Sequence, residues 1–446
     1  MKFGKLFVLF LLIDFFVKGC KSDPGPIMMD QEVANKWADM TLYILKNTPA
    51  NSPTFASRTL GYIGLTMYES IVNGFPEYQS VANQLNGLNR LPGTEPTQSY
   101  VWPLALNAAQ ASILKNIYVQ TSDSNKWRID SLELAILKNY KSRNEKSAIN
   151  RSIAYGKSIA DSIFSWSKTD GGHRGYLHNF DKELKHPVFP GSWRPPLYAQ
   201  SFSHNPLHPH WGENRTFLKQ NAQMDTPNMI RYDTLNTSAY YHQYRAVYDK
   251  EKTLTQEEKE IALWWGDDPD VSITPPGHSY YIALRALRAS HANMVTCAMT
   301  YARVGMAVAD AFINCWKWKY LFFSERPNTF VPEHIDNSWE SFWPDPPFPA
   351  FPSGHAIQSS AASVTLIDIL GNNIAISDST NSLRKRDLLR NTDFKTRHFD
   401  SLSQVPIEVA NSRFYGGIHT PQDNNVGLEE GRKIGSHVNQ LNWKKK

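Results

Sequence analysis

Residues 277–323 read GHSYYIALRALRASHANMVTCAMTYARVGMAVADAFINCWKWKYLFF and contain the longest helical pattern of the chain. Apolar residues recur there every three or four positions, which is the period of a helix with a buried face. The same period continues through much of the remaining sequence, whereas the alternation typical of strands is scarce. These patterns predict an all-α protein.

The predicted helices lie on both sides of a long irregular region. Residues 169–235 are rich in Gly, Pro, His and Asn, which predicts loops there. The helices expected before this region span 31–49, 54–73, 100–119, 122–141 and 145–168. Besides 277–323, those expected after it span 236–266, 354–370, 401–415 and 421–440. This arrangement suggests two helical bundles with an irregular junction, which we place at 20–200 and 201–446.

The chain is 446 residues long, 41% apolar and 20% charged, which is ordinary for a globular protein and excludes disorder and collagen-like repeats. Its formal net charge of +5 comes from its two ends. Residues 1–19 contribute +2 (three lysines minus one aspartate), and the lysines at 444–446 contribute +3. The body is therefore close to neutral, and no nucleic-acid partner is expected.

The first twenty residues, MKFGKLFVLFLLIDFFVKGC, combine a basic start, a short apolar stretch and a Gly19-Cys20 pair. This order is typical of a secretory signal, and the apolar stretch is too short to span a membrane. The Gly-Cys pair resembles the lipobox of bacterial lipoproteins, in which the cysteine is acylated after cleavage. We therefore expect a lipoprotein-type signal peptide at 1–19, a lipid anchor on Cys20, and an exported protein. It would be an outer-membrane or cell-surface lipoprotein, or a periplasmic or secreted protein that is cut nearby without acylation.

Lys319 and Arg326 are seven residues apart, a spacing that would place them about 20° apart around one continuous helix. Pro327 would help to end that helix near Arg326. Apolar and aromatic residues surround both cations, and buried cations need an anion. On its own, such a pair is more often part of a solvated surface.

Ser353, Gly354 and His355 open the predicted helix at 354–370. A helix start leaves main-chain N–H groups free, and its dipole favours an anion. His355 would then lie at the mouth of an anion site, where an acid/base group acts. For this motif alone, a serine cap next to an incidental histidine is the simpler alternative.

Arg413 and His419 flank the Gly416-Gly417 pair, which permits a turn that directs both side chains toward one point. Asp423 follows His419 by about one helical turn, where a carboxylate can hold the imidazole Nδ1–H. Taken together, the three motifs supply three cations, a helix N-terminus and two histidines. A tetrahedral oxyanion such as phosphate needs this combination.

The patterns Lys-x6-Arg-Pro, Pro-Ser-Gly-His and Ser-Arg-x5-His occur in this order, and the chain resembles the type-2 phosphatidic acid phosphatase and vanadium-dependent haloperoxidase superfamily. Its membrane-embedded phosphatases have about six spanning helices, which this chain lacks by sequence. Its soluble acid phosphatases are about one bundle in size. The segments at 52–70, 274–281 and 412–435 are similar to those of the haloperoxidase branch, which includes bacterial members. That branch implies two four-helix-type bundles with the active site in the C-terminal bundle.

The resemblance implies vanadate as the cofactor, with His419 as its direct ligand through a ring nitrogen. His355 would act as the acid/base toward hydrogen peroxide, Lys319 would make the bound oxidant more electrophilic, and Asp423 would orient His419. The predicted function is oxidation of a halide, with iodide or bromide favoured, to hypohalous acid that reacts with an organic acceptor. The residues expected to hold the vanadate oxygens are Lys319, Arg326, Ser353, Gly354 and Arg413.

Trp316 and Phe348 match aromatic positions that line the site in chloroperoxidase-like members, so the resemblance implies a halide pocket there. Algal bromoperoxidases typically have a histidine at the position of Phe348. Related bacterial enzymes with aromatic pockets can be restricted to iodide, so these residues leave the halide open. Asp267 or Asp268 is expected to pair with an active-site arginine.

Two alternatives to a peroxidase remain. An acid phosphatase of the same superfamily would use His419 as a nucleophile that forms a phosphohistidine, and His355 as the acid for the leaving alcohol. The motifs do not distinguish the two chemistries, whereas the chain length and the N-terminal half favour the peroxidase. A non-enzymatic scaffold with a relict pocket is disfavoured by the complete motif set. The sequence does not indicate an oligomeric state.

Overall fold

The computed structural model describes residues 28–195, 205–269 and 271–445. Over these ranges it contains fourteen α-helices and two short strands, which confirms the all-α prediction. The helices of the N-terminal half are α1 (Asp30–Lys46), α2 (Pro53–Glu69), α3 (Trp102–Ile117), α4 (Asp123–Lys141) and α5 (Lys146–Ser167). The later elements are α6 (Lys219–Ala222), α7 (Ala239–Glu251), α8 (Gln256–Trp264), α9 (Thr274–Ala289), α10 (Met294–Phe322), α11 (Pro327–His334), α12 (Gly354–Leu370), β1 (Ile376–Asp378), β2 (Arg397–Phe399), α13 (Gln404–Tyr415) and α14 (Pro421–Asn439).

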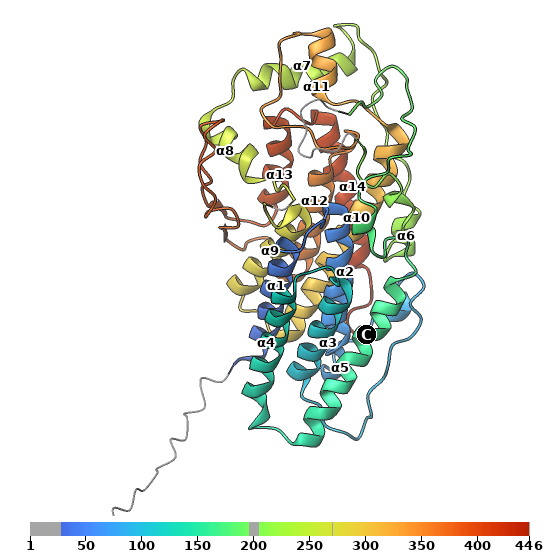
Figure 1. Ribbon diagram of the computed structural model, residues 1–446, viewed down its shortest axis with the longest axis vertical. Coiled ribbons are helices and arrows are strands. Elements are labelled where there is room, and N and C mark those ends of the chain that lie inside the picture. Colours follow the sequence, from blue (N-terminus) through green and yellow to red (C-terminus); the bar gives the residue numbers. More distant parts are fainter. Residues whose placement is uncertain (1–27, 196–204, 270, 446) are drawn as a thin grey trace, which may run out of the picture.

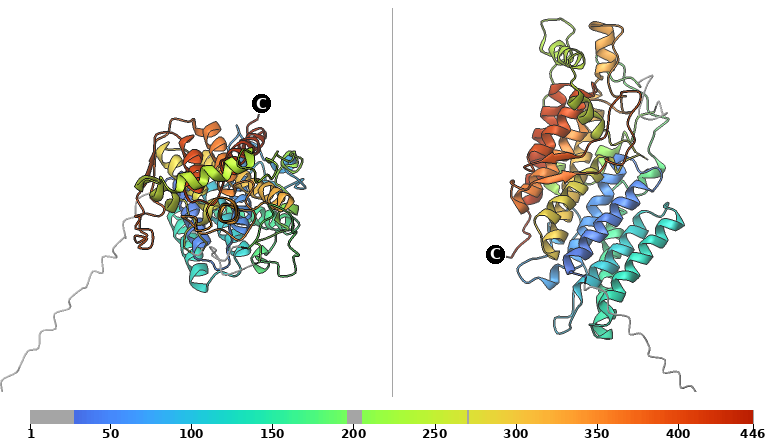
Figure 2. Two further views of the ribbon diagram at one scale, coloured as in Figure 1. Left: turned by 90° about the horizontal axis from the view of Figure 1, so that it is seen from above. Right: turned by 90° about the vertical axis from the view of Figure 1, so that its left-hand side faces the viewer.

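The molecule is elongated, with α3, α4 and α5 toward one end and α7 and α11 at the other (Figure 1). The right-hand view of Figure 2 shows the blue and teal N-terminal helices beside the yellow to red C-terminal ones. The predicted arrangement of two helical bundles is confirmed. The predicted boundary between residues 200 and 201 lies outside the described residues and stays a prediction.

Helix α10 joins the two bundles because it packs very closely against α2. Gly64 on α2 and Gly305 on α10 permit this approach. A Cβ on Gly64 would lie 2.2 Å from the main-chain oxygen of Tyr301, and a Cβ on Gly305 would lie 2.4 Å from that of Leu60. Since atoms cannot approach so closely, a side chain at either position would force the two helices apart.

The two longest predicted helices are each divided into two by a new N-terminal cap. Over 236–266, Thr255 and Glu258 form a capping box that starts α8. Over 277–323, the side chain of Asn293 accepts a hydrogen bond from a first-turn N–H and starts α10. The apolar period continues across both breaks, which is why periodicity alone joined the helices.

Helix α10 also ends before Arg326, so the prediction that one helix face carries both Lys319 and Arg326 is wrong. Phe323 adopts a left-handed conformation with φ 45°, and the helix stops at Phe322. Arg326 is the N-cap residue of α11, whose first residue is Pro327. A turn, not a continuous helix, therefore connects the two cations.

The described part of 169–235 is mainly irregular, as predicted, and contains only the short α6 and single turns of 3-10 helix. Besides α6, the elements that were not predicted are α11 and the two strands β1 and β2. The strands are antiparallel, with Ile376 opposite Phe399. At three residues each, they are too short to produce a recognisable alternation.

Helices α12 and α14 carry the residues on either side of the predicted site, and they also cross at short range. Gly427, Gly431 and Gly435 of α14 face α12. At Gly431 a Cβ would lie 2.2 Å from the main-chain oxygen of Ile357. The close crossing brings the start of α12 next to the start of α14.

None of the described helices combines the length and the apolar character needed to cross a membrane. The predicted signal peptide at 1–19 and the predicted lipid anchor on Cys20 lie outside the described residues. Both stay predictions.

Candidate functional site

A cavity of about 450 Å³ contains most of the residues that the motifs singled out. Its wall combines side chains from α10, α12 and α13 with the turn that precedes α14. Apolar residues such as Pro53 and Phe180 complete the wall on the side of the N-terminal bundle. The sequence-predicted residues along it are Trp316, Phe348, Gly354, His355, Arg413 and His419.

Lys319 is buried beside this cavity. Its ammonium group donates hydrogen bonds to the main-chain oxygens of Pro349 (2.9 Å) and Ala350 (2.6 Å), and one N–H remains for another acceptor. Burial lowers the pKa of Lys319, and the positive charge of Arg326 lowers it further. The group therefore needs a nearby anion to stay charged.

The two arginines are buried as well, and carbonyl groups hold their guanidinium planes. Arg326 donates to the main-chain oxygens of Phe348 (3.0 Å) and Ile418 (2.8 Å). Arg413 Nη2 donates to that of Ala262 (2.9 Å), while Nη1 has no partner among the described residues. Burial lowers the pKa of both arginines, that of Arg413 to about 10.

The N-terminus of α12 forms a second side of the site. Ser353 caps the helix, since its side chain accepts from the Ala356 N–H, and its own N–H donates to the main-chain oxygen of Asp423 (3.0 Å). A Cβ on Gly354 would lie 4.0 Å from Cε of Lys319. The positive end of the helix dipole thus lies next to a buried ammonium group, which again requires an anion.

His419 precedes α14, and its Nδ1 lies 3.0 Å from Oδ2 of Asp423. The same carboxylate accepts from the Thr420 N–H in a capping box, so the contact spans a helix start and not a continuous turn. Burial lowers the pKa of His419 well below its ordinary value, and the three nearby cations add to this effect. The neutral ring donates from Nδ1 and keeps the lone pair of Nε2, as a metal ligand or a nucleophile requires.

His355 lines the cavity from the first turn of α12. Its Nε2 has no hydrogen-bond partner in the described part of the chain. Burial lowers its pKa well below the ordinary value, and the charges of Arg413 and His419 lower it further. His355 is therefore a neutral, unoccupied base that faces the cavity.

The two aromatic residues of the predicted halide pocket lie together. The ring centroids of Trp316 and Phe348 are 4.9 Å apart, and the planes are inclined by 51°. Trp316 Nε1 donates to the main-chain oxygen of Leu207 (3.0 Å), which fixes the ring. Lys319 Nζ lies 5.1 Å from the Phe348 centroid, so the polarisable faces adjoin the cation cluster.

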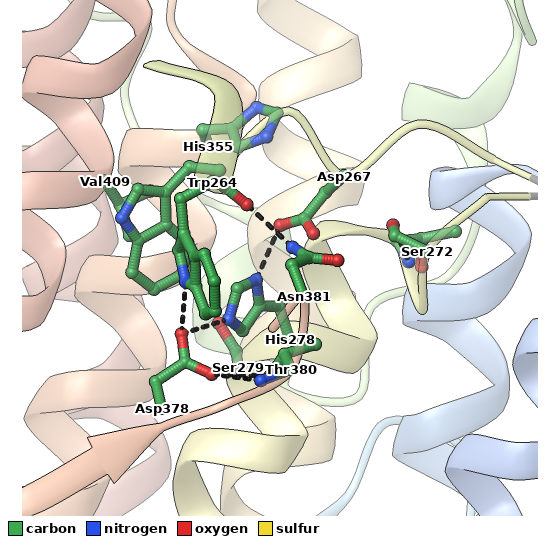
Figure 3. A network of polar contacts seen from close by, with 12 residues as sticks. Trp264, Asp267, Ser272, His278, Ser279, His355, Asp378, Thr380, Asn381 and Val409 are labelled. Carbon is green, nitrogen blue, oxygen red and sulfur yellow. Dashed lines mark hydrogen bonds and ion pairs between the residues drawn. The ribbon is translucent and has the colours of Figure 1, made fainter. Parts of the chain in front are cut away.

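The sequence did not reveal the segment at 262–267, which contacts the site through main-chain groups. Asp267 does not form a salt bridge with an arginine among the described residues. Its Oδ2 lies 2.8 Å from Nδ1 of His278, although its charge and that of Asp268 act on Arg413 (Figure 3). The available signal was the histidine in TPPGHSYY, which follows the paired aspartates by about ten residues.

The residues present fit a tetrahedral oxyanion. Lys319, Arg326 and Arg413 are buried, and none of them forms a salt bridge with a carboxylate in the described ranges. Arg413 Nη1 and the remaining Lys319 N–H are donors for which the described part of the chain offers no acceptor. Such donors are costly in a buried site unless a ligand accepts their hydrogen bonds, and a multiply charged oxyanion does so.

Residues 299–444 match the family model described as the VCPO second helical-bundle domain. A solved structure of a bacterial vanadium-dependent iodoperoxidase is 31% identical, with a TM-score of 0.80, over 94% of this chain and 98% of that one. The chain belongs to the vanadium-dependent haloperoxidase family. It is therefore an enzyme of a family that acts on peroxide and uses vanadate as its cofactor.

The chain is also similar to two vanadium chloroperoxidases. The vanadium chloroperoxidase of Curvularia inaequalis is 24% identical over 457 residues, which cover 83% of this chain and 74% of the relative. A holo-type bacterial vanadium-dependent chloroperoxidase is 17% identical, with a TM-score of 0.68, over 93% of this chain and 98% of that one. The second of these similarities concerns the fold alone.

Proposed function

We propose that this haloperoxidase uses hydrogen peroxide to oxidise iodide, and more slowly bromide, to hypohalous acid, which then halogenates an organic acceptor. The cluster of three buried cations, none of which forms a salt bridge with a carboxylate of the described residues, carries this proposal, because it is suited to a bound vanadate. The similarity to an iodoperoxidase supports the choice of halide. Iodide is also the halide that is easiest to oxidise and the most polarisable, and the rings of Trp316 and Phe348 offer it a polarisable wall.

In this proposal His419 binds the vanadium through Nε2, and Asp423 holds the ring by its Nδ1–H. When bound, vanadate supplies a Lewis-acidic centre that activates hydrogen peroxide toward attack by the halide. The residues proposed to hold its oxygens are Lys319, Arg326, Ser353, Gly354 and Arg413.

His355 has the geometry of the proton acceptor in this scheme. Its free Nε2 and its neutral state suit removal of a proton from hydrogen peroxide as the peroxide enters the cavity. The remaining N–H of Lys319 is available to polarise an oxygen of the bound oxidant. Both groups act from walls that carbonyl contacts and the α12 cap hold in place, so little reorganisation is needed.

The proposal is tested by matched assays on the purified protein. Protein loaded with orthovanadate is given hydrogen peroxide with iodide, bromide or chloride, and vanadate-free protein serves as the control. We expect rapid formation of triiodide, slower oxidation of bromide and background rates with chloride. The vanadate-free protein is also given a phosphomonoester, because a neutral His419 can act as a nucleophile. Phosphate release without oxidation of any halide would replace the proposal with phosphatase activity.

The carboxylate of Asp423 is expected to determine how tightly vanadate is retained. In Asp423→Asn the imidazole loses its charged partner, and we expect the dissociation constant of vanadate to rise about 10-fold to 100-fold. Equilibrium dialysis, followed by measurement of vanadium, gives this constant. Glu430→Gln is the control, since it removes a carboxylate from the same helix that pairs with Lys433 instead. If Asp423→Asn retained vanadate as tightly as the wild type, a hydrogen bond from an uncharged partner would be sufficient to hold His419, and the prediction would be wrong.

A further inference from the structure

His278 of α9 is buried between two carboxylates and belongs to none of the three motifs (Figure 3). Its Nδ1 lies 2.8 Å from Oδ2 of Asp267, and its Nε2 lies 2.7 Å from Oδ2 of Asp378. Each contact requires an N–H on that nitrogen, so both nitrogens are protonated and the ring is a cation. Burial alone would lower its pKa, but the two carboxylates outweigh this effect and raise the pKa to about 10.

Asp378 is firmly anchored, so the cation is held on a rigid support. Asp378 lies at the end of β1, and it accepts from Trp264 Nε1 (2.6 Å) and from Thr380 Oγ1 (2.6 Å). Asn381, from the same turn, donates to the main-chain oxygen of Trp264 (2.8 Å). The hairpin thus contacts the end of α8 at two points besides His278.

The residues after α8 are held by His278 from the other side. The ring of Trp265 stacks on His278 at 4.1 Å between centroids. Asp267 has a left-handed backbone with φ 50°, which is unfavourable for a residue other than glycine and needs support from its contacts. One of its carboxylate oxygens is bound by His278, and the other has no partner in the part of the chain described.

The segment at 262–267 contacts Arg413 and forms part of the cavity wall. Arg413 Nη2 donates to the main-chain oxygen of Ala262, and the charge of Asp267 acts on Arg413. Gly266 and Asp267 line the same cavity as His355. Displacement of the segment would therefore alter the direction of Arg413 and the shape of the wall beside His355.

We propose that His278 is a positioning residue of this enzyme: it clamps the segment at 262–267 between α9 and β1, and thereby holds Arg413 in the orientation that binds a tetrahedral oxyanion. The inference rests on the proposed function only in taking vanadate as that oxyanion. His278, Asp267 and Asp378 would thus support the site from behind without contacting the oxyanion. A loss of His278 should therefore weaken anion binding without changing the aromatic wall at Trp316 and Phe348.

The test compares His278→Gln with the wild-type enzyme, using inorganic phosphate as the probe. Phosphate binding to the vanadate-free protein is measured by calorimetry, so the result does not depend on halide oxidation. We expect the dissociation constant of phosphate to rise about tenfold or more. With saturating vanadate, we expect kcat for iodide to fall about tenfold while KM for iodide stays within about twofold.

Asp170→Asn is the matched control. It disrupts a buried ion pair with Arg58 in the N-terminal bundle (2.6 Å), so it lowers stability without touching the segment at 262–267. We expect its phosphate affinity and kcat to equal those of the wild type. Equal values in folded His278→Gln would overturn the proposal. If His278→Gln does not fold, Asp378→Asn provides the same comparison, and a normal phosphate constant in that variant would be equally contrary.

Discussion

Replacement of His419 by alanine is expected to reduce the rate of iodide oxidation roughly a thousandfold or more, even in an excess of vanadate. His419 is the imidazole whose Nδ1 is held by Asp423 while its Nε2 keeps a lone pair toward the cavity. His355 cannot substitute, because it belongs to the first turn of a different helix, α12, and has no carboxylate such as Asp423 to hold its ring among the described residues. The measurement combines the initial rate of triiodide formation with the vanadium content of the dialysed protein.

His437→Ala is the control for this variant. It removes a half-buried histidine from α14, whose Nδ1 lies 2.7 Å from Oδ1 of Asn221, well removed from the cavity wall. We expect it to retain both vanadium and turnover. If His419→Ala also retained vanadium and oxidised iodide at the wild-type rate, the assignment of His419 as the vanadium ligand would be wrong.

Gly431→Ala is expected to produce a large loss of stability, about 3 kcal/mol in the free energy of unfolding. The new Cβ would lie 2.2 Å from the main-chain oxygen of Ile357 and 2.8 Å from Cβ of Ser360, so α12 and α14 would have to separate. Activity should fall as well, because the two helices start at Ser353 and next to His419. Urea unfolding followed by tryptophan fluorescence measures the loss.

Gly93→Ala separates this steric effect from the general effect of replacing a glycine. A Cβ on Gly93 would meet no atom within 4 Å, and its backbone is not left-handed. We expect its stability to stay within about 0.5 kcal/mol of the wild type. A Gly431→Ala protein that is as stable and as active as Gly93→Ala would contradict the close crossing of α12 and α14.

The helical class and the motif residues could be predicted from the sequence because they depend on short-range patterns. The apolar period defines the helices, and the spacing around Gly416 and Gly417 predicts the turn that precedes His419. The breaks at Thr255 and Asn293 also had a local signal, since both are common capping residues. A single capping residue is a weak signal, and the apolar periodicity that continues through each break outweighed it.

The rest depends on main-chain groups and on distant contacts, which leave no pattern in the side-chain sequence. Lys319 is held by the carbonyl groups of Pro349 and Ala350, and any residue has such a group. His278 is paired with Asp378, one hundred residues later in the chain. No local spacing predicts such a pair, so the contact between His278 and Asp378 is seen only in the three-dimensional structure, where α9 lies next to β1.

The close packing of α2 against α10 has a consequence for how this enzyme can be recombined with its relatives. The helix that carries Lys319 near its end is pressed, in its first half, against Gly64 of the other bundle. In a chimera that takes each bundle from a different parent, a mismatch at this contact would displace α10, and the displacement would extend along the helix to the Lys319 ammonium group. The two bundles therefore have to be exchanged together, and crossover points suited to protein engineering lie in the peripheral loops rather than between the bundles.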